Sequence, residues 1–392
     1  MTNISKRKIV IIFTCFGIIL NMILLSPQIA KYQIGNILNS IYWILCIVLI
    51  SILFRRQHIN KYFIYIFMLS SIYIIILLIN SILWGNKIGF YDFAYIFIPL
   101  FIFYYGLNIS DIICRDISTI ADTFLFSCSL LIVSVYYNYY ITGYSIESSV
   151  YAAGVAKNSI GPLIVVGLIF IISGLSTKFN RLFFIFFYIS LVLLKSRTPL
   201  YSFTFFILPL YLFNKLWHTR KNITKNDIIK YIAILMFAII AILYIDFDYI
   251  LNTFFYGGRD KSNIDELTSG RWTSYVNFFY YINEGIICGN IDYYIDNFFM
   301  NSILHYGIFA ATVLTLISFT PIMYSLEIYS FSKLGRAFFY INILFFITMF
   351  LEAGGNLIPG SRSYILWILF GILTTHRRYR IGEKQPIVYV SS

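Results

Sequence analysis

The chain has 392 residues, of which 59% are hydrophobic and only 12% are charged. A soluble domain carries roughly a quarter charged residues, and it could not keep so much Ile, Leu, Phe and Tyr out of water. This composition therefore excludes a soluble globular protein. The five cysteines form no CxxC pair and the four histidines are scattered, so we predict no metal site and no cofactor.

Twelve apolar segments that could cross a membrane follow one another along the chain. They cover approximately 9–25, 37–54, 62–84, 90–108, 121–141, 160–175, 181–195, 199–216, 231–250, 298–325, 337–352 and 363–375. The first follows three basic residues, as a signal peptide would, but it is long for one and no small-residue cleavage site follows, so we expect an uncleaved span. The sequence predicts an all-α, polytopic membrane protein of about twelve spans, with residues 1–392 forming a single membrane domain.

The basic residues indicate the orientation of these spans. If the N-terminus lies inside, 20 of the 29 Lys and Arg residues fall in inner loops and 9 fall on the outer side. This is the asymmetry of the positive-inside rule, and it explains most of the net charge of +12 without a nucleic acid partner. We therefore predict a multi-pass protein of the bacterial inner (cytoplasmic) membrane with both termini in the cytoplasm.

The longest loop, residues 246–297, joins the ninth and tenth spans on the outer side. Within it, five residues recur at helical i, i+3, i+4 spacing: Trp272, Tyr275, Val276, Phe279 and Tyr280. Four are aromatic, which favours a helix that lies in the outer membrane interface. A surface helix without a specific role is the alternative.

Basic residues on the outer side are exceptions to the charge rule and so carry more information than those inside. Arg197 lies at the outer end of the seventh span, Arg271 opens the predicted loop helix, and Arg362 precedes the last span. A guanidinium group is always charged, and its planar fork matches phosphate oxygens with two parallel hydrogen bonds. Three such groups on one side suggest an anionic ligand such as a lipid pyrophosphate, although each could instead reach ordinary lipid phosphates.

Two short patches resemble motifs of the O-antigen polymerase and O-antigen ligase superfamily. The first is Gly-Val-Ala-Lys-Asn-Ser-Ile-Gly at 154–161, which includes Lys157 and Asn158. It is similar to the family's asparagine-containing patch before the sixth span. The second is Ser-Arg-Thr-Pro-Leu at 196–200, which is similar to the family's Ser-Arg-Thr or Ser-Arg-Gly motif.

A third patch covers the long loop and the start of the tenth span. The ligase branch has His-Asn there, then apolar residues four and seven positions after the His, and Gly at eleven. This chain has Asp296-Asn297, Met300, Ile303 and Gly307 at those offsets, so the spacing matches but Asp replaces His. A nearby histidine, His305, is displaced by nine positions. The departure favours the polymerase branch over the ligase branch.

The resemblance implies a glycosyltransferase that joins polyprenyl-pyrophosphate-linked oligosaccharide repeat units into O-antigen or a similar surface polysaccharide. Its partners would be these lipid-linked oligosaccharides, membrane lipids and possibly a chain-length regulator protein. Arg197 and Arg271, with Arg362 third, would stabilise the leaving pyrophosphate.

The acceptor hydroxyl needs a base, for which Asp296 is the first candidate and Glu352 the second. Asp296 could instead be a helix N-cap. The side chains of Lys157, Asn158 and Asn297 could bind sugar or phosphate, or could also cap helices.

Three other functions remain possible at this stage. An O-antigen ligase would need an outer catalytic histidine at the matching position. A lipid-linked oligosaccharide flippase would place charges along a central cavity and would show two similar halves, and no internal repeat is visible. A structural or regulatory membrane protein would not need clustered outer arginines.

Overall fold

The computed structural model describes residues 3–30, 32, 34–54, 58–142, 157–178, 181–194, 196–219, 271–330, 332–353, 355–357 and 362–382. All regular structure in these ranges is helical, as predicted. The helices are α1 (Asn3–Leu24), α2 (Pro27–Ala30), α3 (Gly35–Leu53), α4 (Lys61–Trp84), α5 (Phe90–Ile113), α6 (Ile117–Thr142), α7 (Lys157–Ile172), α8 (Arg181–Leu193), α9 (Arg197–Tyr201), the π-helix η1 (Ser202–Ile207), α10 (Leu208–Thr219), α14 (Arg271–Gly285), α15 (Phe298–Ile328), α16 (Lys333–Leu351) and α17 (Tyr364–Gly382).

Many of these helices have the length and composition of membrane spans. Among the described residues, 6 helices are long and apolar enough to cross a membrane, and α3, α7, α8 and α17 contain shorter apolar stretches. Large apolar side chains such as Ile52, Ile82 and Leu182 are exposed, which suits a surface in contact with lipid. The chain is therefore a membrane-embedded helical protein. Each predicted span overlaps a helix except 231–250, which lies outside the described residues, so the count of twelve stays a prediction.

The last span is short because protein surrounds it. Ten consecutive residues of α17, from Tyr364 to Leu373, are buried on all sides, the pattern of a helix enclosed by its neighbours. Its closest neighbour is α5, and small residues let the two backbones meet: a Cβ atom on Gly106 would collide with the backbone of Ile368, and one on Gly371 with that of Phe103. Thus α17 forms the centre of the bundle.

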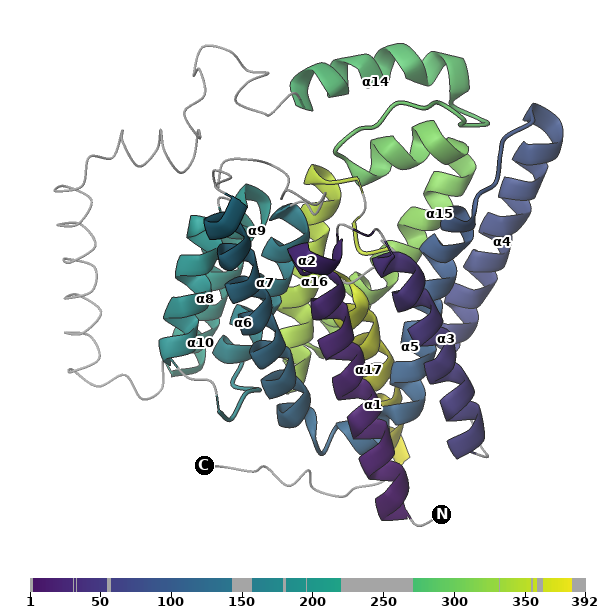
Figure 1. The fold of residues 1–392 in the computed structure, drawn as a ribbon. Coiled ribbons are helices and arrows are strands. Elements are labelled where there is room, and N and C mark those ends of the chain that lie inside the picture. Colours follow the sequence, from purple (N-terminus) through teal and green to yellow (C-terminus); the bar gives the residue numbers. More distant parts are fainter. Residues whose placement is uncertain are drawn as a thin grey trace, which may run out of the picture.

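The two ends of the bundle differ. Figure 1 shows α14 lying across one end, which we call the α14 end, while α1 begins and α17 and α10 end at the opposite, terminal end. At the terminal end, Arg7 of α1 forms a two-pronged ion pair with Asp116, with Nε–Oδ2 and Nη2–Oδ1 distances of 2.8 and 2.7 Å.

Helix α15 is interrupted near the α14 end, whereas the sequence predicted a continuous span. Gly307 has φ 80° and ψ 165°, a conformation that is essentially restricted to glycine. The break frees backbone groups, and the chain after α14 satisfies them: Asn290 N–H donates to His305 O and Ile308 N–H donates to Ile286 O. The side-chain amide of Asn80 in α4 donates to Tyr306 O at 3.1 Å. The break is thus built into the packing.

Candidate functional site

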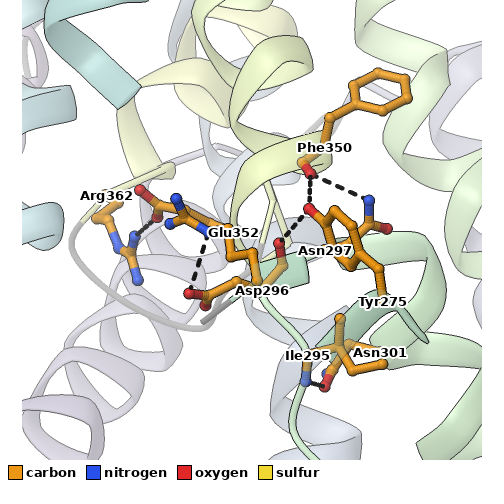
Figure 2. A network of polar contacts seen from close by, with 9 residues as sticks. Tyr275, Ile295, Asp296, Asn297, Asn301, Phe350, Glu352 and Arg362 are labelled. Carbon is orange, nitrogen blue, oxygen red and sulfur yellow. Dashed lines mark hydrogen bonds and ion pairs between the residues drawn. The ribbon is translucent and has the colours of Figure 1, made fainter. Parts of the chain in front are cut away.

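Four of the predicted site residues meet in one group at the α14 end. Arg362, just before α17, places Nη1 2.5 Å from Oε2 of Glu352, which follows α16. Arg271, the first residue of α14, places Nε 3.4 Å from Oδ2 of Asp296, which lies just before α15. Figure 2 shows Asp296, Glu352 and Arg362 together in this network. We call these four residues the charge cluster.

Glu352 is the most deeply buried member of the cluster. Its residue is only 5% exposed, and Oε1 has no hydrogen-bond partner among the residues that the structure describes. Burial raises the pKa of the Glu352 carboxyl, because the charged form loses water; the nearby Arg362 guanidinium acts in the opposite direction but more weakly. Negative charge from Asp296 also raises this pKa, and positive charge from Arg271 lowers it. All four members therefore share one electrostatic environment.

The second pair is looser and more accessible. The Asp296 side chain is 35% exposed, compared with 7% for Glu352. The Nε atom of Arg271 is buried and, among the described residues, forms no hydrogen bond of good geometry, because Asp296 lies at 3.4 Å. The Arg271 side chain is 20% exposed, so the accessible part of its guanidinium, and not the buried Nε atom, is suited to meet an incoming anion.

Helix-capping falls to Asn297 and not to Asp296. The N-cap residue of α15 is Asn297, whose side-chain oxygen accepts a hydrogen bond from Met300 N–H at 3.1 Å. Its amide nitrogen donates to Phe350 O, one of the carbonyl groups left unpaired at the end of α16. Asn297 thus has a structural role, while the capping alternative for Asp296 is wrong and its carboxylate remains available to the cluster.

A tyrosine attaches α14 to this network. The hydroxyl of Tyr275 lies 3.3 Å from Phe350 O and 3.4 Å from Asp296 O. The sequence placed Tyr275 on the interfacial face of the loop helix, but in the structure it turns inward. The other four residues of the predicted face are 53–68% exposed: Trp272, Val276, Phe279 and Tyr280. Whether this exposed face meets the membrane interface stays a prediction.

Arg197 lies on a separate element, the short helix α9, which contacts α7 and α16. The two predicted motif patches meet here: a Cβ atom on Gly161 of α7 would lie 2.6 Å from Ser196 Oγ and 2.8 Å from Pro199 Cγ. Only glycine allows this approach. A π-helical segment, η1, follows α9 directly, a feature that often marks functional sites. Lys157 and Asn158 begin α7, and their side chains lie outside the described residues.

Two residues that precede Asp296 at intervals of two, Tyr294 and Asp292, escaped sequence reasoning. His305, which the sequence showed only as a displaced histidine, lies next to the helix break, near Asp92 and Asp292. The only signal in the sequence was the alternation of Asp, Tyr and Asp, which is too short to stand out.

The sequence matches no protein-family model and no curated protein. Among the described residues, no group of three or more His, Cys, Asp or Glu side chains could hold a metal ion. The charge cluster and Tyr275 bring arginine, carboxylate and tyrosine side chains together at the α14 end.

Proposed function

We propose that this protein is a polysaccharide polymerase that joins polyprenyl-pyrophosphate-linked oligosaccharide repeat units on the outer side of the bacterial inner membrane. The observation that carries the proposal is the charge cluster: two arginines and two carboxylates from four chain segments meet at the end of the bundle that the positive-inside rule assigns to the outer side. The resemblance to the O-antigen polymerase and ligase superfamily supplies the reaction. The twelve-span topology with cytoplasmic termini belongs to the same proposal.

The arginines act on the leaving group. An acceptor hydroxyl oxygen attacks the anomeric carbon of the donor sugar, and the bond from that carbon to the pyrophosphate oxygen breaks. The electron pair leaves with polyprenyl pyrophosphate, so negative charge grows on this oxygen. Arg271, whose side chain is 20% exposed at the cluster, stabilises that charge, with Arg197 on α9 as the second cation. Because Arg362 is paired with Glu352, it acts on the pyrophosphate through its positive charge more than through direct hydrogen bonds.

A carboxylate takes the proton of the acceptor hydroxyl. Asp296 is the better placed of the two candidates, because its side chain is 35% exposed and can reach a sugar that enters from outside. Glu352 is buried and paired with Arg362, so we assign it the role of counter-ion. In this scheme Asn297 holds the neighbouring Asp296 in position, because the Asn297 side chain donates a hydrogen bond to Phe350 O in α16.

Genetic complementation tests this function. In a deletion strain, wild-type protein should restore long polymer, whereas Arg271→Ala and Arg197→Ala, present at normal levels in the membrane, should leave single repeat units on the surface lipid. The matched control is Arg115→Ala, because Arg115 is exposed in the loop between α5 and α6 at the terminal end. This variant should make polymer of normal length.

The deletion strain also separates the rival functions. Loss of a ligase leaves long chains on the carrier lipid, and loss of a flippase leaves undecorated surface lipid with single units trapped inside. A structural or regulatory protein would leave polymer chemistry unchanged. Normal polymer in the Arg197→Ala and Arg271→Ala strains would reject the proposed mechanism.

A further inference from the structure

The chain between α14 and α15 carries an exposed polar face whose role the charge cluster does not explain. From Ile291 to Ile295 burial alternates residue by residue, as expected for extended backbone. Ile291, Tyr293 and Ile295 pack against the inner side of α14 and the start of α15. The intervening side chains, Asp292 and Tyr294, are exposed and continue towards Asp296.

The inward residues fix this segment, so the outward face is held in place. The Tyr293 ring lies 4.8 Å from that of Tyr281 on α14, centroid to centroid, and its hydroxyl accepts a hydrogen bond from the Asn277 amide at 2.9 Å. At one end of the segment, Ile291 N–H donates to Leu304 O; at the other, Ile295 N–H donates to the Asn301 side chain at 3.2 Å. Such support preorganises the face for a ligand.

Tyr294 combines exposure with a position beside the charges. Its residue is 65% exposed, yet its hydroxyl lies near enough to Asp296, Arg362 and Glu352 to interact with their charges. Burial of the hydroxyl end, together with the negative charge of Asp296, raises the pKa of this phenol, so it stays a neutral hydrogen-bond donor. Tyr294 is thus an exposed aromatic residue that lies two positions before Asp296 in the chain.

We propose that Asp292 and Tyr294, leading to Asp296, form the binding edge for the acceptor saccharide. This proposal rests on the proposed polymerase function and names the part of the site that positions the acceptor. The C–H face of a pyranose ring can stack on the exposed tyrosine ring, and its hydroxyls can donate to the flanking carboxylates. The acceptor hydroxyl then arrives beside the proposed base, Asp296.

The geometry favours a neutral, hydroxyl-rich ligand at this edge and not the pyrophosphate. Two carboxylates on the same face repel an anion, whereas a sugar hydroxyl can donate to them. The buried Oε1 of Glu352, which has no hydrogen-bond partner among the described residues, offers a further acceptor within the cluster. The pyrophosphate of the donor is then bound by Arg271 and Arg197, whereas the neutral acceptor sugar binds along the carboxylates.

A binding experiment tests this edge independently of catalysis. The probe is the free oligosaccharide released by mild acid from the lipid-linked repeat units of the source strain. In saturation-transfer NMR with the full-length protein in detergent, wild type should transfer saturation to the sugar protons. Tyr294→Ala should lose most of this signal, and Tyr294→Phe, which keeps the ring, should retain it. The control is Tyr140→Ala, since Tyr140 is 88% exposed on α6, a helix that contributes no residue to the charge cluster.

Kinetics with the same variants link the edge to the reaction. With lipid-linked units as donor and the free oligosaccharide as acceptor, Tyr294→Ala should raise KM for the acceptor about two- to tenfold, the loss expected for one aromatic contact, and should leave KM for the donor unchanged. Asp292→Asn should show a smaller shift in the same direction. If wild type binds the oligosaccharide but forms no polymer, the polymerase proposal fails and the saccharide edge stands. Equal signals for wild type and Tyr294→Ala would overturn the edge itself.

Discussion

The two ends of the bundle use the same residue types in different ways. At the terminal end, Arg7 and Asp116 make two short contacts at 2.7 and 2.8 Å, so the groups that face each other are fully engaged. At the α14 end, Arg271 and Asp296 approach at only 3.4 Å, with Nε of Arg271 left without a good hydrogen bond among the described residues. The short pair at the terminal end leaves the Asp116 side chain 18% exposed, whereas the looser pair at the α14 end leaves the Asp296 side chain 35% exposed. A more accessible carboxylate, and not charge alone, distinguishes the α14 end.

The tight pair within the α14 end should matter most for stability. Arg362→Ala removes the partner of the buried Glu352 carboxylate, and breaking a buried pair in this way costs about 3–5 kcal/mol. Arg7→Ala at the terminal end breaks a pair whose arginine side chain is 45% exposed, and we expect a much smaller loss. The thermal unfolding midpoint of each variant in detergent measures the difference. Equal midpoints for the two variants would contradict the assignment of Glu352 and Arg362 as a structural pair.

The loose pair should matter most for activity. Arg271→Lys keeps the positive charge but loses the planar fork that binds two phosphate oxygens, and we expect polymer formation to fall by roughly a hundredfold. The same substitution at the terminal end, Arg7→Lys, should change the rate less than twofold. Polymerisation rates on lipid-linked units, measured at equal protein amounts, check both values. A fully active Arg271→Lys variant would mean that charge alone suffices.

Much of the helical framework could be predicted from the sequence, because long apolar runs have few alternatives in a membrane. The break at Gly307 could not, since a glycine within an apolar run is also compatible with a continuous helix. Only the partners, Asn80 from α4 and the chain near Ile286, show that the freed backbone groups are satisfied. The contact of Asn80 with Tyr306 joins residues 226 positions apart in the chain.

The candidate site was predictable as a set of charges but not as a set of pairs. Charge at the outer boundary costs free energy unless it is paired, which singled out Arg271 and Arg362, whereas Asp296 and Glu352 were candidates for the base. Which carboxylate meets which arginine depends on how α14 docks, and Tyr275 fixes that docking through Phe350. Sequence reasoning placed Tyr275 on the outer face of α14. Helical spacing predicts which residues share one face of a helix, but it does not show which of them contact the rest of the protein.

Two asparagine caps extend the comparison between the ends. Asn60 caps α4 at the terminal end by accepting from Phe63 N–H at 2.8 Å, and Asn297 caps α15 at the α14 end. Replacing either with Ala should cost about 1 kcal/mol of stability. Only Asn297→Ala should also lower the polymerisation rate, because it releases the residue next to Asp296 from Phe350. Equal loss of activity in both variants would show that the caps act through stability alone.

The α14 end should also respond to pH, through the buried Glu352 carboxyl. Because burial raises the pKa of Glu352 above its ordinary value of 4.5, the folded protein binds this proton more tightly than the unfolded chain does. Stability from this group is therefore complete below the ordinary pKa and decreases as pH rises through the raised one. Glu352→Gln should remove this slope from the unfolding midpoint above pH 4.5, even if its absolute midpoint is lower because Arg362 has lost a charged partner. The pH dependence of the midpoint, and not its absolute value, reports on the Glu352 carboxyl. If Glu352→Gln shows the same pH dependence as wild type, another group causes it and Glu352 is charged throughout the pH range. That outcome would make the cluster a permanent arrangement of two positive and two negative charges, and Asp296 would then be its one carboxylate open to an incoming hydroxyl.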